Sequence, residues 1–331
     1  LLEAKLNVVK VFSPEHGFRG TASAGEELNN DVDKATGLAI ISLYGKDKKP
    51  SPAMLEDVDV VLFDIQDVGV RFYTYISTMS LVMEACAESN VAMIILDRPN
   101  PNGHYVDGPT LKPGFESFVG MHHIPVVHGM TVGEYAKMVN GQYWLKDSVQ
   151  CNLTVVPILG YAHTMVFSLQ VPPSPNLPND EAIRLYPSLC FFEGTIVSVG
   201  RGTDKPFQQI GAPWLQKEFP NYSFTPTPNY GAKDPKVKGE KCYGVDLTPF
   251  AKGFLVRYNQ LYLYWLIESY AVADDQENFF NSFFDKLAGS ETLRIQIVSG
   301  ASEEEIRQSW QADLIAFKKL RRQYLLYPDF E

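Results

Sequence analysis

The sequence predicts a two-domain α/β protein whose amino-terminal domain is built on a parallel β-sheet. Three observations predict this fold class. The length of 331 residues exceeds what one hydrophobic core usually serves, apolar runs alternate with segments of helical periodicity, and a proline-rich stretch lies near the middle of the chain. No apolar run approaches the length of about 18 residues that is needed to span a bilayer, so we expect no membrane-spanning segment.

The strands of the predicted sheet are short apolar runs rich in β-branched residues. They cover residues 7–12, 58–65, 91–96 and 153–158. Two of the intervening helices have start signals: Ser51 precedes Pro52, and Thr131 with Glu134 has the form of a capping box. Strands that alternate with helices in this way are typical of a parallel sheet.

A proline-rich stretch predicts where the first domain ends. Pro172-Pro-Ser-Pro175 can neither continue a helix nor lie in a central strand. We place the boundary near Arg184, which gives domains of residues 1–184 and 185–331.

The second domain is predicted to be smaller and of mixed α and β structure. Residues 195–199 and 242–247 favour strands, and residues 261–272 and 278–287 favour helices. A final helix is predicted by a capping box of Ser302 and Glu305 and by apolar residues at three- and four-residue intervals from Ile306 to Tyr324. Packing explains that apolar stripe better than ligand binding does.

The charge balance and the cysteines narrow the possible partners. With 29 basic and 39 acidic residues the formal net charge is −10, which disfavours nucleic acid as a partner. The four cysteines, Cys86, Cys151, Cys190 and Cys242, have no Cys-x-x-Cys spacing, so buried free thiols are favoured, although the even number leaves a disulfide possible.

The first candidate site is the loop Ser13-Pro-Glu-His-Gly-Phe-Arg-Gly20, which follows a predicted strand. Its proline stiffens the turn and its glycines allow unusual dihedrals, so Glu15, His16 and Arg19 can be held together. A buried carboxyl group there is suited to general acid catalysis. The alternative is an ion pair that only ties down the loop.

The second candidate site is the stretch from Phe63 to Tyr75, again directly after a strand. It supplies more polar groups than a simple connection needs: Asp64, Gln66, Asp67, Arg71, Tyr73 and Tyr75. The alternative interpretation is a helix start capped by an aspartate, with the aromatic residues packed beneath it.

Two further groups of residues complete the candidates. Asp97 and Arg98 lie at another strand end, whereas the asparagines that follow them are common in turns for local reasons. Asn176, Glu193 and Arg201 belong to the region around the predicted boundary. Arg201 lies between two glycines, and a guanidinium suits bidentate binding of a carboxylate, although a solvated turn arginine is the plainer alternative.

Several other chemistries lack their motifs. The sequence contains no Gly-x-Gly-x-x-Gly after the early strand, no Walker-type loop and no Gly-x-Ser-x-Gly elbow, so a nucleotide site or a serine hydrolase has little support. His122, His123 and His128 lack the spacing of a metal site, which favours surface or hydrogen-bonded histidines.

Taken together, five motifs resemble the exo-β-N-acetylmuramidase family of peptidoglycan hexosaminidases. They are Ser13-Pro-Glu-His-Gly-Phe-Arg-Gly20, the stretch from Phe63 to Tyr75, Leu96-Asp-Arg-Pro-Asn-Pro-Asn102, Ser174-Pro-Asn176 and Ser198-Val-Gly-Arg-Gly-Thr203. The resemblance extends from about Asn7 to Tyr327. Family members carry a further strand, loop and helix before this point, and Leu1 to Lys5 has the pattern of a helix end, so we expect the sequence to be part of a longer chain.

The resemblance implies a Rossmann-like amino-terminal domain, a smaller carboxyl-terminal domain and an active cleft between or beside them. It implies hydrolysis of β-linked N-acetylmuramic acid (MurNAc) from the non-reducing end of peptidoglycan fragments, without metal or organic cofactor. It also implies a periplasmic or secreted enzyme of cell-wall recycling, with the cytoplasm as the alternative location. Finally, it implies that Glu15 is the catalytic acid of the family.

Glycoside cleavage needs a group that protonates the leaving oxygen and a second group that stabilises the oxocarbenium-like centre. We assign the first role to Glu15. For the second role we favour Asp64 or Asp67, acting on water or on the substrate's own 2-acetamido group, with Glu26 and Glu193 in reserve. The lactyl carboxylate of MurNAc calls for an arginine, and Arg71, Arg98 and Arg201 are the candidates.

Two other functions remain open at this stage. A non-catalytic cell-wall receptor would stack Tyr73, Tyr75 and Trp214 on sugar rings and would bind without turnover. An α/β hydrolase acting on another acidic sugar or a small ester is the third possibility. The stereochemical outcome and the oligomeric state are not predicted.

Overall fold

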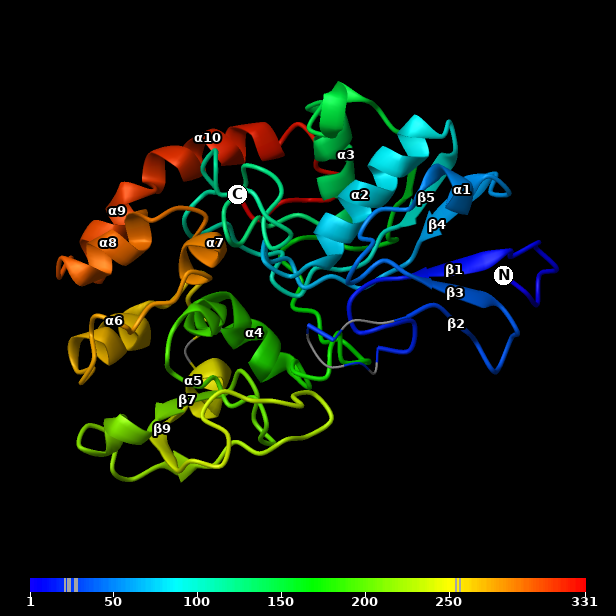
Figure 1. Ribbon diagram of the computed structural model, residues 1–331. Helices are drawn as coiled ribbons and strands as arrows, with labels where there is room; N and C mark the ends of the chain where they lie inside the picture. The colour runs from blue at the N-terminus through cyan, green and yellow to red at the C-terminus, as the bar shows by residue number, and fades with distance from the viewer. Residues whose placement is uncertain (21, 23–24, 27–28, 254, 256) are drawn as a thin grey trace.

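The structure is a computed structural model that describes residues 1–20, 22, 25–26, 29–253, 255 and 257–331. Thr21, Ser23, Ala24, Glu27 and Leu28, which follow the first candidate site loop, lie outside the described residues. The fold is mixed α/β, with parallel strands in the amino-terminal half and mostly helices in the carboxyl-terminal half (Figure 1). Among the described helices, none has the length and apolar character to cross a membrane.

Three of the four predicted strands form a parallel sheet. β4 (Val60–Phe63), β5 (Ala92–Leu96) and β6 (Leu153–Val156) pair side by side in that order. Parallel neighbours need crossover connections, and α2 (Tyr75–Glu88) and α3 (Val132–Gly141) lie in these connections. The loops at the carboxyl ends of the strands therefore lie on the same edge of the sheet.

The first predicted strand belongs to a separate sheet, which corrects the expectation of a shared sheet. β1 (Lys10–Ser13) pairs in parallel with β3 (Ala39–Ser42), and β3 pairs antiparallel with β2 (Asp31–Val32). The sequence analysis missed β3, because a run of four residues between loops has too little periodicity to be recognised.

The predicted helix starts differ in whether their capping hydrogen bonds form. The capping box at the start of α3 is confirmed, because Thr131 Oγ1 accepts from Glu134 N at 3.2 Å and Thr131 N donates to Glu134 Oε2 at 2.9 Å. α1 (Pro52–Leu55) is only one turn, and Ser51 makes no capping bond. α2 begins after Thr74, whose hydroxyl makes no capping bond either and is used elsewhere.

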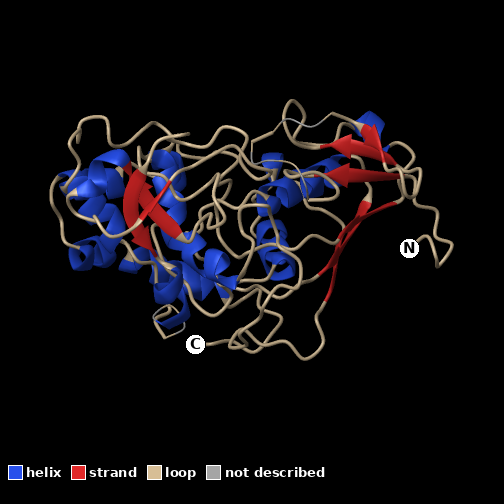
Figure 2. Cartoon of the chain, turned by 90° about the horizontal axis from the view of Figure 1, so that it is seen from below, coloured by secondary structure: helices blue, strands red, loops and turns tan. Residues whose placement is uncertain are grey.

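A third sheet, antiparallel, lies near the opposite end of the molecule from the other two (Figure 2). It has the order β7 (Gln209–Ala212), β9 (Cys242–Asp246), β8 (Ser223–Phe224). β9 confirms one predicted strand. The strand predicted for residues 195–199 is wrong, because the segment forms only single bridges, one of them from Thr195 to Phe280.

The helices of the carboxyl-terminal half are short. Their bounds are α4 (Asp180–Leu189), α5 (Thr248–Gly253), α6 (Tyr264–Ala271), α7 (Phe284–Ala288), α8 (Thr292–Val298), α9 (Glu303–Ser309) and α10 (Gln311–Arg321), with 3₁₀ turns η1 (Lys146–Ser148), η2 (Cys190–Gly194) and η3 (Pro213–Gln216). The helix predicted for residues 278–287 begins only at Phe284, because Asn281 N donates to Gly194 O at 2.9 Å instead of entering a helix. The capping box at Ser302 is confirmed, but the final helix is divided at Trp310.

The end of the chain returns to the amino-terminal half, where it lies beside α3 (Figure 1). Leu326 N donates to Glu134 Oε1 at 2.8 Å, and His163 N donates to Pro328 O at 3.0 Å. The fully buried Arg321 binds Gly129 O and the carboxylate of Asp329. These contacts join the two halves of the fold.

All four cysteines are buried free thiols, as the sequence favoured.

Candidate functional site

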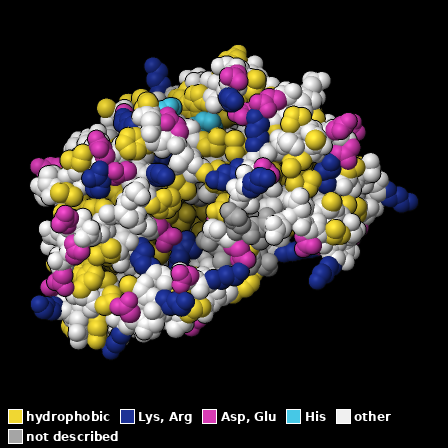
Figure 3. All heavy atoms as spheres, viewed as in Figure 1, with side chains coloured by type: hydrophobic (Ala, Val, Ile, Leu, Met, Phe, Trp, Pro, Cys, Tyr) yellow, Lys and Arg dark blue, Asp and Glu magenta, His cyan; other side chains and the backbone are white. Residues whose placement is uncertain are grey.

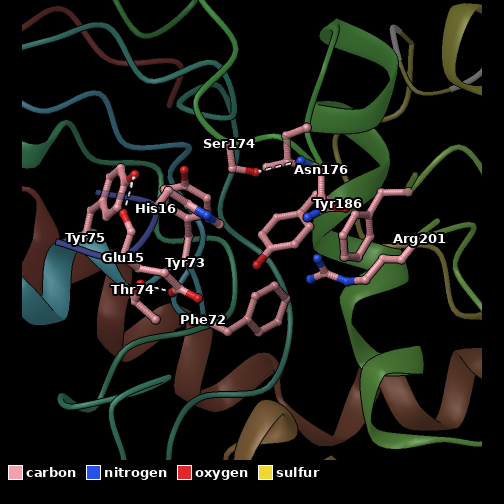
Figure 4. A pocket seen from close by; sticks show the side chains of 12 residues that line it. Glu15, His16, Phe72, Tyr73, Thr74, Tyr75, Ser174, Asn176, Tyr186 and Arg201 are labelled. Carbon is pink, nitrogen blue, oxygen red and sulfur yellow. Dashed lines mark hydrogen bonds between the residues drawn. The ribbon is translucent and has the colours of Figure 1, made fainter. Parts of the chain in front are cut away.

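A pocket lies where the loop after β1 meets the start of α2 and the segments that flank α4. Its space, part of which is open to solvent, is about 390 Å³. The lining residues are Glu15, His16, Phe72, Tyr73, Thr74, Tyr75, Ser174, Asn176, Leu177, Tyr186, Arg201 and Phe207. Figure 4 shows that Glu15 and Arg201 approach the pocket from opposite walls. The face seen in Figure 3 is hollowed near its centre, where hydrophobic side chains gather with acidic and basic ones.

Glu15 is held at the pocket by the turn that follows β1 and by the start of α2. His16 and Gly17 have φ angles of 70° and 78°, which turn the chain back after Glu15. Glu15 Oε2 accepts from Thr74 Oγ1 at 2.7 Å, and Oε1 accepts from Gly25 N at 2.9 Å. Thr74 is the residue before α2, so the carboxylate lies at a helix N-terminus, where negative charge is favoured.

The neighbours of Glu15 are fixed in turn. Tyr75 Oη donates to the backbone oxygen of Glu15 at 3.1 Å. Tyr44 also contacts the Glu15 carboxylate, and burial together with that charge holds the pKa of Tyr44 well above its usual value. Burial lowers the pKa of His16, whose Nδ1 lies 2.8 Å from Ala22 O, so its imidazole is neutral at neutral pH.

Arg201 supplies the positive charge of the opposite wall. Gly200 and Gly202, with φ angles of 77° and 79°, form the turn that presents it. Its Nε and Nη2 donate to Glu193 Oε2 at 3.0 and 2.9 Å, and its guanidinium lies over the ring of Phe207. Although burial opposes the charged form, the Glu193 carboxylate raises the pKa of Arg201 above its usual value. Among the described residues the guanidinium makes hydrogen bonds only to Glu193, so its other N–H groups can bind a ligand.

Aromatic rings line the space between the two walls. Tyr186 makes edge contacts with Phe72 and Phe207, and Tyr73 packs against Tyr75. Tyr73 Oη donates to Pro173 O at 2.7 Å, which fixes its ring. Rigid aromatic faces beside one acid and one cation suit a ligand with an apolar ring face and a negative group.

Two of the predicted carboxylates lie outside the pocket lining. Asp64 is half exposed and forms an ion pair with the equally exposed Arg98 at 2.6 Å. Asp67 is buried, with Oδ2 accepting from Gly69 N at 2.6 Å and Oδ1 without a partner among the described residues. Burial raises the pKa of Asp67 to about 7. Asp67 does not cap α2, so the alternative interpretation of this stretch also fails in its detail.

Arg71 does not reach the pocket, which corrects its assignment as an anion-binding residue. It is 1% exposed, and its guanidinium donates to the backbone oxygens of Pro109, Ile124 and Leu287 at 2.7 to 2.8 Å. Those carbonyls belong to both halves of the fold. Arg71 is therefore a buried connection and is not accessible to a substrate.

Asp97 is likewise engaged inside the protein. Its Oδ2 accepts from Thr131 Oγ1 at 2.7 Å and from Tyr327 Oη at 2.6 Å, and its Oδ1 accepts from Gly133 N at 2.8 Å. Although four hydrogen bonds favour the charged form, burial raises its pKa. Asp97 therefore stabilises the start of α3 and is not at the pocket.

Three more predicted residues lie away from the pocket lining. Arg19 is mostly exposed and pairs with Asp33 at 2.5 Å. Gln66 donates to backbone oxygens of Asp67 and Pro99. Trp214 packs against Phe279 in the other half of the fold. Of the predicted residues, the structure brings Glu15, His16, Tyr73, Tyr75, Asn176 and Arg201 together, with Glu193 behind Arg201.

The sequence analysis missed several lining residues. Thr74 lies in the stretch from Phe63 to Tyr75, which was already a candidate site. Its position just before a helix was the signal that could have identified it. Tyr186 lies on α4, directly beyond the predicted boundary, and no local pattern marks it. Tyr44 reaches Glu15 from a loop with no recognisable motif.

The histidines do not form a metal site in the part of the chain that the structure describes. That part contains no group of three or more His, Cys, Asp or Glu residues placed to hold a metal ion. His122 stacks on Trp144, and His128 is fully buried beside Tyr135. Burial lowers the pKa of His122 to about 4 and that of His128 to about 3.

Two family models match almost the whole chain. The model described as Exo-beta-N-acetylmuramidase NamZ, N-terminal, matches residues 1–181, and the model described as Exo-beta-N-acetylmuramidase NamZ, C-terminal, matches residues 184–327. A curated protein of Bacillus subtilis (strain 168), named peptidoglycan beta-N-acetylmuramidase NamZ, is 41% identical over 344 residues. That alignment covers 97% of this chain and 80% of the relative.

Two solved structures have the same fold. A DUF1343 family protein from Bacteroides fragilis NCTC 9343 superposes with a TM-score of 0.91 at 47% identity and covers 99% of this chain and 88% of its own. A second DUF1343 family protein from the same strain has a TM-score of 0.81 at 33% identity, covering 97% of this chain and 87% of its own.

Proposed function

The chain belongs to the exo-β-N-acetylmuramidase NamZ family, and from that membership we infer that it is a peptidoglycan glycosidase. It releases terminal β-linked MurNAc from the non-reducing end of peptidoglycan fragments. The site assignment rests on one observation: Glu15 and Arg201 lie on opposite walls of the same pocket. A non-catalytic receptor and a hydrolase of other acidic sugars are not favoured.

Glu15 is the proposed acid that protonates the leaving oxygen. Its contact with Thr74 supports this role, because a hydroxyl donates to a carboxylate and accepts from a carboxylic acid, so the contact persists in both protonation states. The acid of a glycosidase must pass through both states in each turnover.

The substrate's own 2-acetamido group is the proposed second group. Glu15 is the only acidic residue among the described residues that line the pocket. Asp64 is paired with Arg98, Asp67 lies beneath the surface and Glu193 is held by Arg201. Neighbouring-group participation retains the β configuration, so proton NMR of the first product should detect β-MurNAc before the α anomer forms; initial release of the α anomer would contradict this mechanism.

Arg201 is the proposed partner of the lactyl carboxylate, which distinguishes MurNAc from N-acetylglucosamine (GlcNAc). It is the one arginine among the described lining residues. Hydrogen bonds to a charged group contribute about 1.5–3 kcal/mol, so Arg201→Gln should reduce kcat/KM for a chromogenic MurNAc glycoside by about 10- to 100-fold.

The control for this experiment is the matching GlcNAc glycoside, which lacks the lactyl group. Its slow hydrolysis should change little in Arg201→Gln, so the preference for MurNAc should fall. An equal loss on both substrates would mean that Arg201 does not recognise the lactyl group. A wild-type protein that binds MurNAc without releasing it would support the receptor instead.

The division into two domains and the cellular location are also proposals. We propose a Rossmann-like domain of residues 1–184 and a smaller domain of residues 185–331 that completes the pocket. The position of peptidoglycan outside the cytoplasmic membrane supports a periplasmic or secreted enzyme in cell-wall recycling. Expression of each range alone, followed by limited proteolysis, would test whether the two units fold independently.

A further inference from the structure

A segment of the carboxyl-terminal half, residues 227–236, borders the pocket and is called the rim segment below. Its first residues are fixed to the turn that presents Arg201. Thr227 N donates to Gly202 O at 2.9 Å, and Asn229 Nδ2 donates to Thr203 O at 3.4 Å. A side chain at Gly202 would collide with Thr227 O, so the two backbones are in close contact.

The rim segment is fixed a second time to a lining residue of the pocket. Asn176 Nδ2 donates to Gly231 O at 2.7 Å. A Cβ at Gly231 would lie 3.1 Å from Asn176 Oδ1 and 3.2 Å from Pro175 Cβ, so little room remains between the rim segment and the pocket wall.

A third attachment holds the turn that contains Glu193. Lys236 Nζ donates to the backbone oxygens of Phe192 and Val197 at 2.8 and 3.1 Å, and also to that of Thr195. The ammonium thereby fills a cluster of three carbonyls behind the pair formed by Glu193 and Arg201. The rim segment is thus attached at three places: to the turn that presents Arg201, to Asn176 and to the turn that contains Glu193.

Between these attachments, Tyr230 stands in a tight turn from Asn229 to Ala232. Asn229 Oδ1 accepts from Gly231 N at 3.1 Å and from Ala232 N at 3.0 Å, which stiffens the turn. Even so, Tyr230 is 61% exposed. The same segment reaches the other wall, because Lys233 Nζ lies 2.5 Å from Glu26 Oε1, in the loop that follows Glu15.

The proposed place of the terminal MurNAc is the pocket between Glu15 and Arg201, and the rim segment borders this pocket through its bond to Asn176. When the terminal MurNAc occupies this space, the sugar joined to its C1 must lie at the mouth, beside the rim segment.

We propose that Tyr230 is the platform on which the leaving sugar stacks, so that the rim segment forms the subsite for the residue next to the scissile bond. This inference rests on the proposed glycosidase function. A tyrosine ring offers a flat apolar face to the C–H groups of a sugar and loses little conformational entropy on binding, because its side chain has only two χ angles. Tyr230 would contribute to binding through this contact and would take no part in the cleavage of the glycosidic bond.

The experiment compares two substrates that differ only in the leaving group. The first is a disaccharide of MurNAc β-linked to GlcNAc, and the second is β-MurNAc fluoride, whose leaving group is one atom. For Tyr230→Ala we expect KM for the disaccharide to rise about three- to tenfold, while the kinetics of the fluoride stay unchanged. Tyr230→Trp should keep the low KM, because indole offers a similar face.

Tyr143→Ala is the matched control, because Tyr143 is 55% exposed and does not line the pocket. Free GlcNAc provides a second measurement: it should inhibit hydrolysis of the disaccharide competitively in the wild type and more weakly in Tyr230→Ala. An unchanged KM for the disaccharide, or an equal rise for both substrates, would overturn the proposal. Failure of the wild type to cleave either substrate would reject the proposed function itself.

Discussion

The loop that contains Glu15 and the loop that contains Asp97 have similar local structure but different surroundings. Each carboxylate follows a strand of a parallel pair, β1 or β5, and each accepts hydrogen bonds at the start of a helix. Glu15 faces a pocket. Asp97 is covered by Tyr327, which is 230 positions away in the sequence. The carboxyl end of a parallel strand is therefore a place where a site can form, and the chain that packs over it decides whether one does.

The two carboxylates also differ in how completely they are bound. Asp97 accepts four hydrogen bonds, from Arg98 N, Thr131 Oγ1, Gly133 N and Tyr327 Oη. Glu15 accepts from Thr74 and Gly25, is also contacted by Tyr44, and lines the pocket. A fully bound carboxylate stabilises the fold, whereas one that lines a pocket can act on a ligand.

The strongest test of this comparison removes each carboxylate in turn. Glu15→Gln should lower kcat for a MurNAc glycoside by about 10³-fold, because general acid catalysis contributes about 10²–10⁴-fold. Thermal unfolding should change little. Asp97→Asn should show the reverse, with kcat nearly unchanged and a loss of about 1–3 kcal/mol in the free energy of unfolding. Equal losses of activity in both variants would remove the distinction between the two loops.

Asp67 extends the comparison to a third carboxyl group, which is buried away from the pocket and is bound less completely than Asp97. Burial raises its pKa to about 7, above the value of about 3.9 in an unfolded chain. Its stabilising contribution is therefore complete below pH 4 and is lost as the pH rises through 7. Across that window the slope reaches about 1.4 kcal/mol per pH unit.

Denaturant titrations of the wild type and Asp67→Asn at several pH values would measure this effect. The variant cannot ionise at this position, so its stability relative to the wild type should increase from pH 4 to pH 8. A constant difference between the two proteins would show that Asp67 is not shifted.

The sequence predicted the structural features that depend on residues close together in the chain. The β4, β5 and β6 runs and the capping box at Thr131 follow from local periodicity and capping chemistry. The turn made Glu15 a candidate, and its assignment as the acid came from the family resemblance. The sequence could not predict that Arg71 would be enclosed by three carbonyls, one of them 216 positions away, because charge and position favoured an exposed role.

Tyr327→Phe tests whether the returning chain end controls the Asp97 loop. The substitution removes the hydroxyl that donates to Asp97 Oδ2 and that accepts from Ile158 N at 3.0 Å. Because both partners are then left short of a hydrogen bond, we expect a loss of about 1–2 kcal/mol in the free energy of unfolding. KM and kcat at a temperature where the protein is folded should stay unchanged. A large fall in kcat would place the Asp97 loop in the catalytic machinery.

The smallest effect is expected at the pair of Asp64 and Arg98, which lies at strand ends but is solvated. The side chains are 44% and 41% exposed, so water and salt screen their attraction at 2.6 Å. Arg98→Ala and Asp64→Asn should each change the free energy of unfolding by less than about 1 kcal/mol and leave kcat within about twofold. Raising the salt concentration should reduce even that difference. A loss of activity in Asp64→Asn comparable to that in Glu15→Gln would restore Asp64 as a catalytic group, acting on water or on the substrate's own 2-acetamido group, because a carboxylate paired on the surface would then have to move into the pocket when substrate binds.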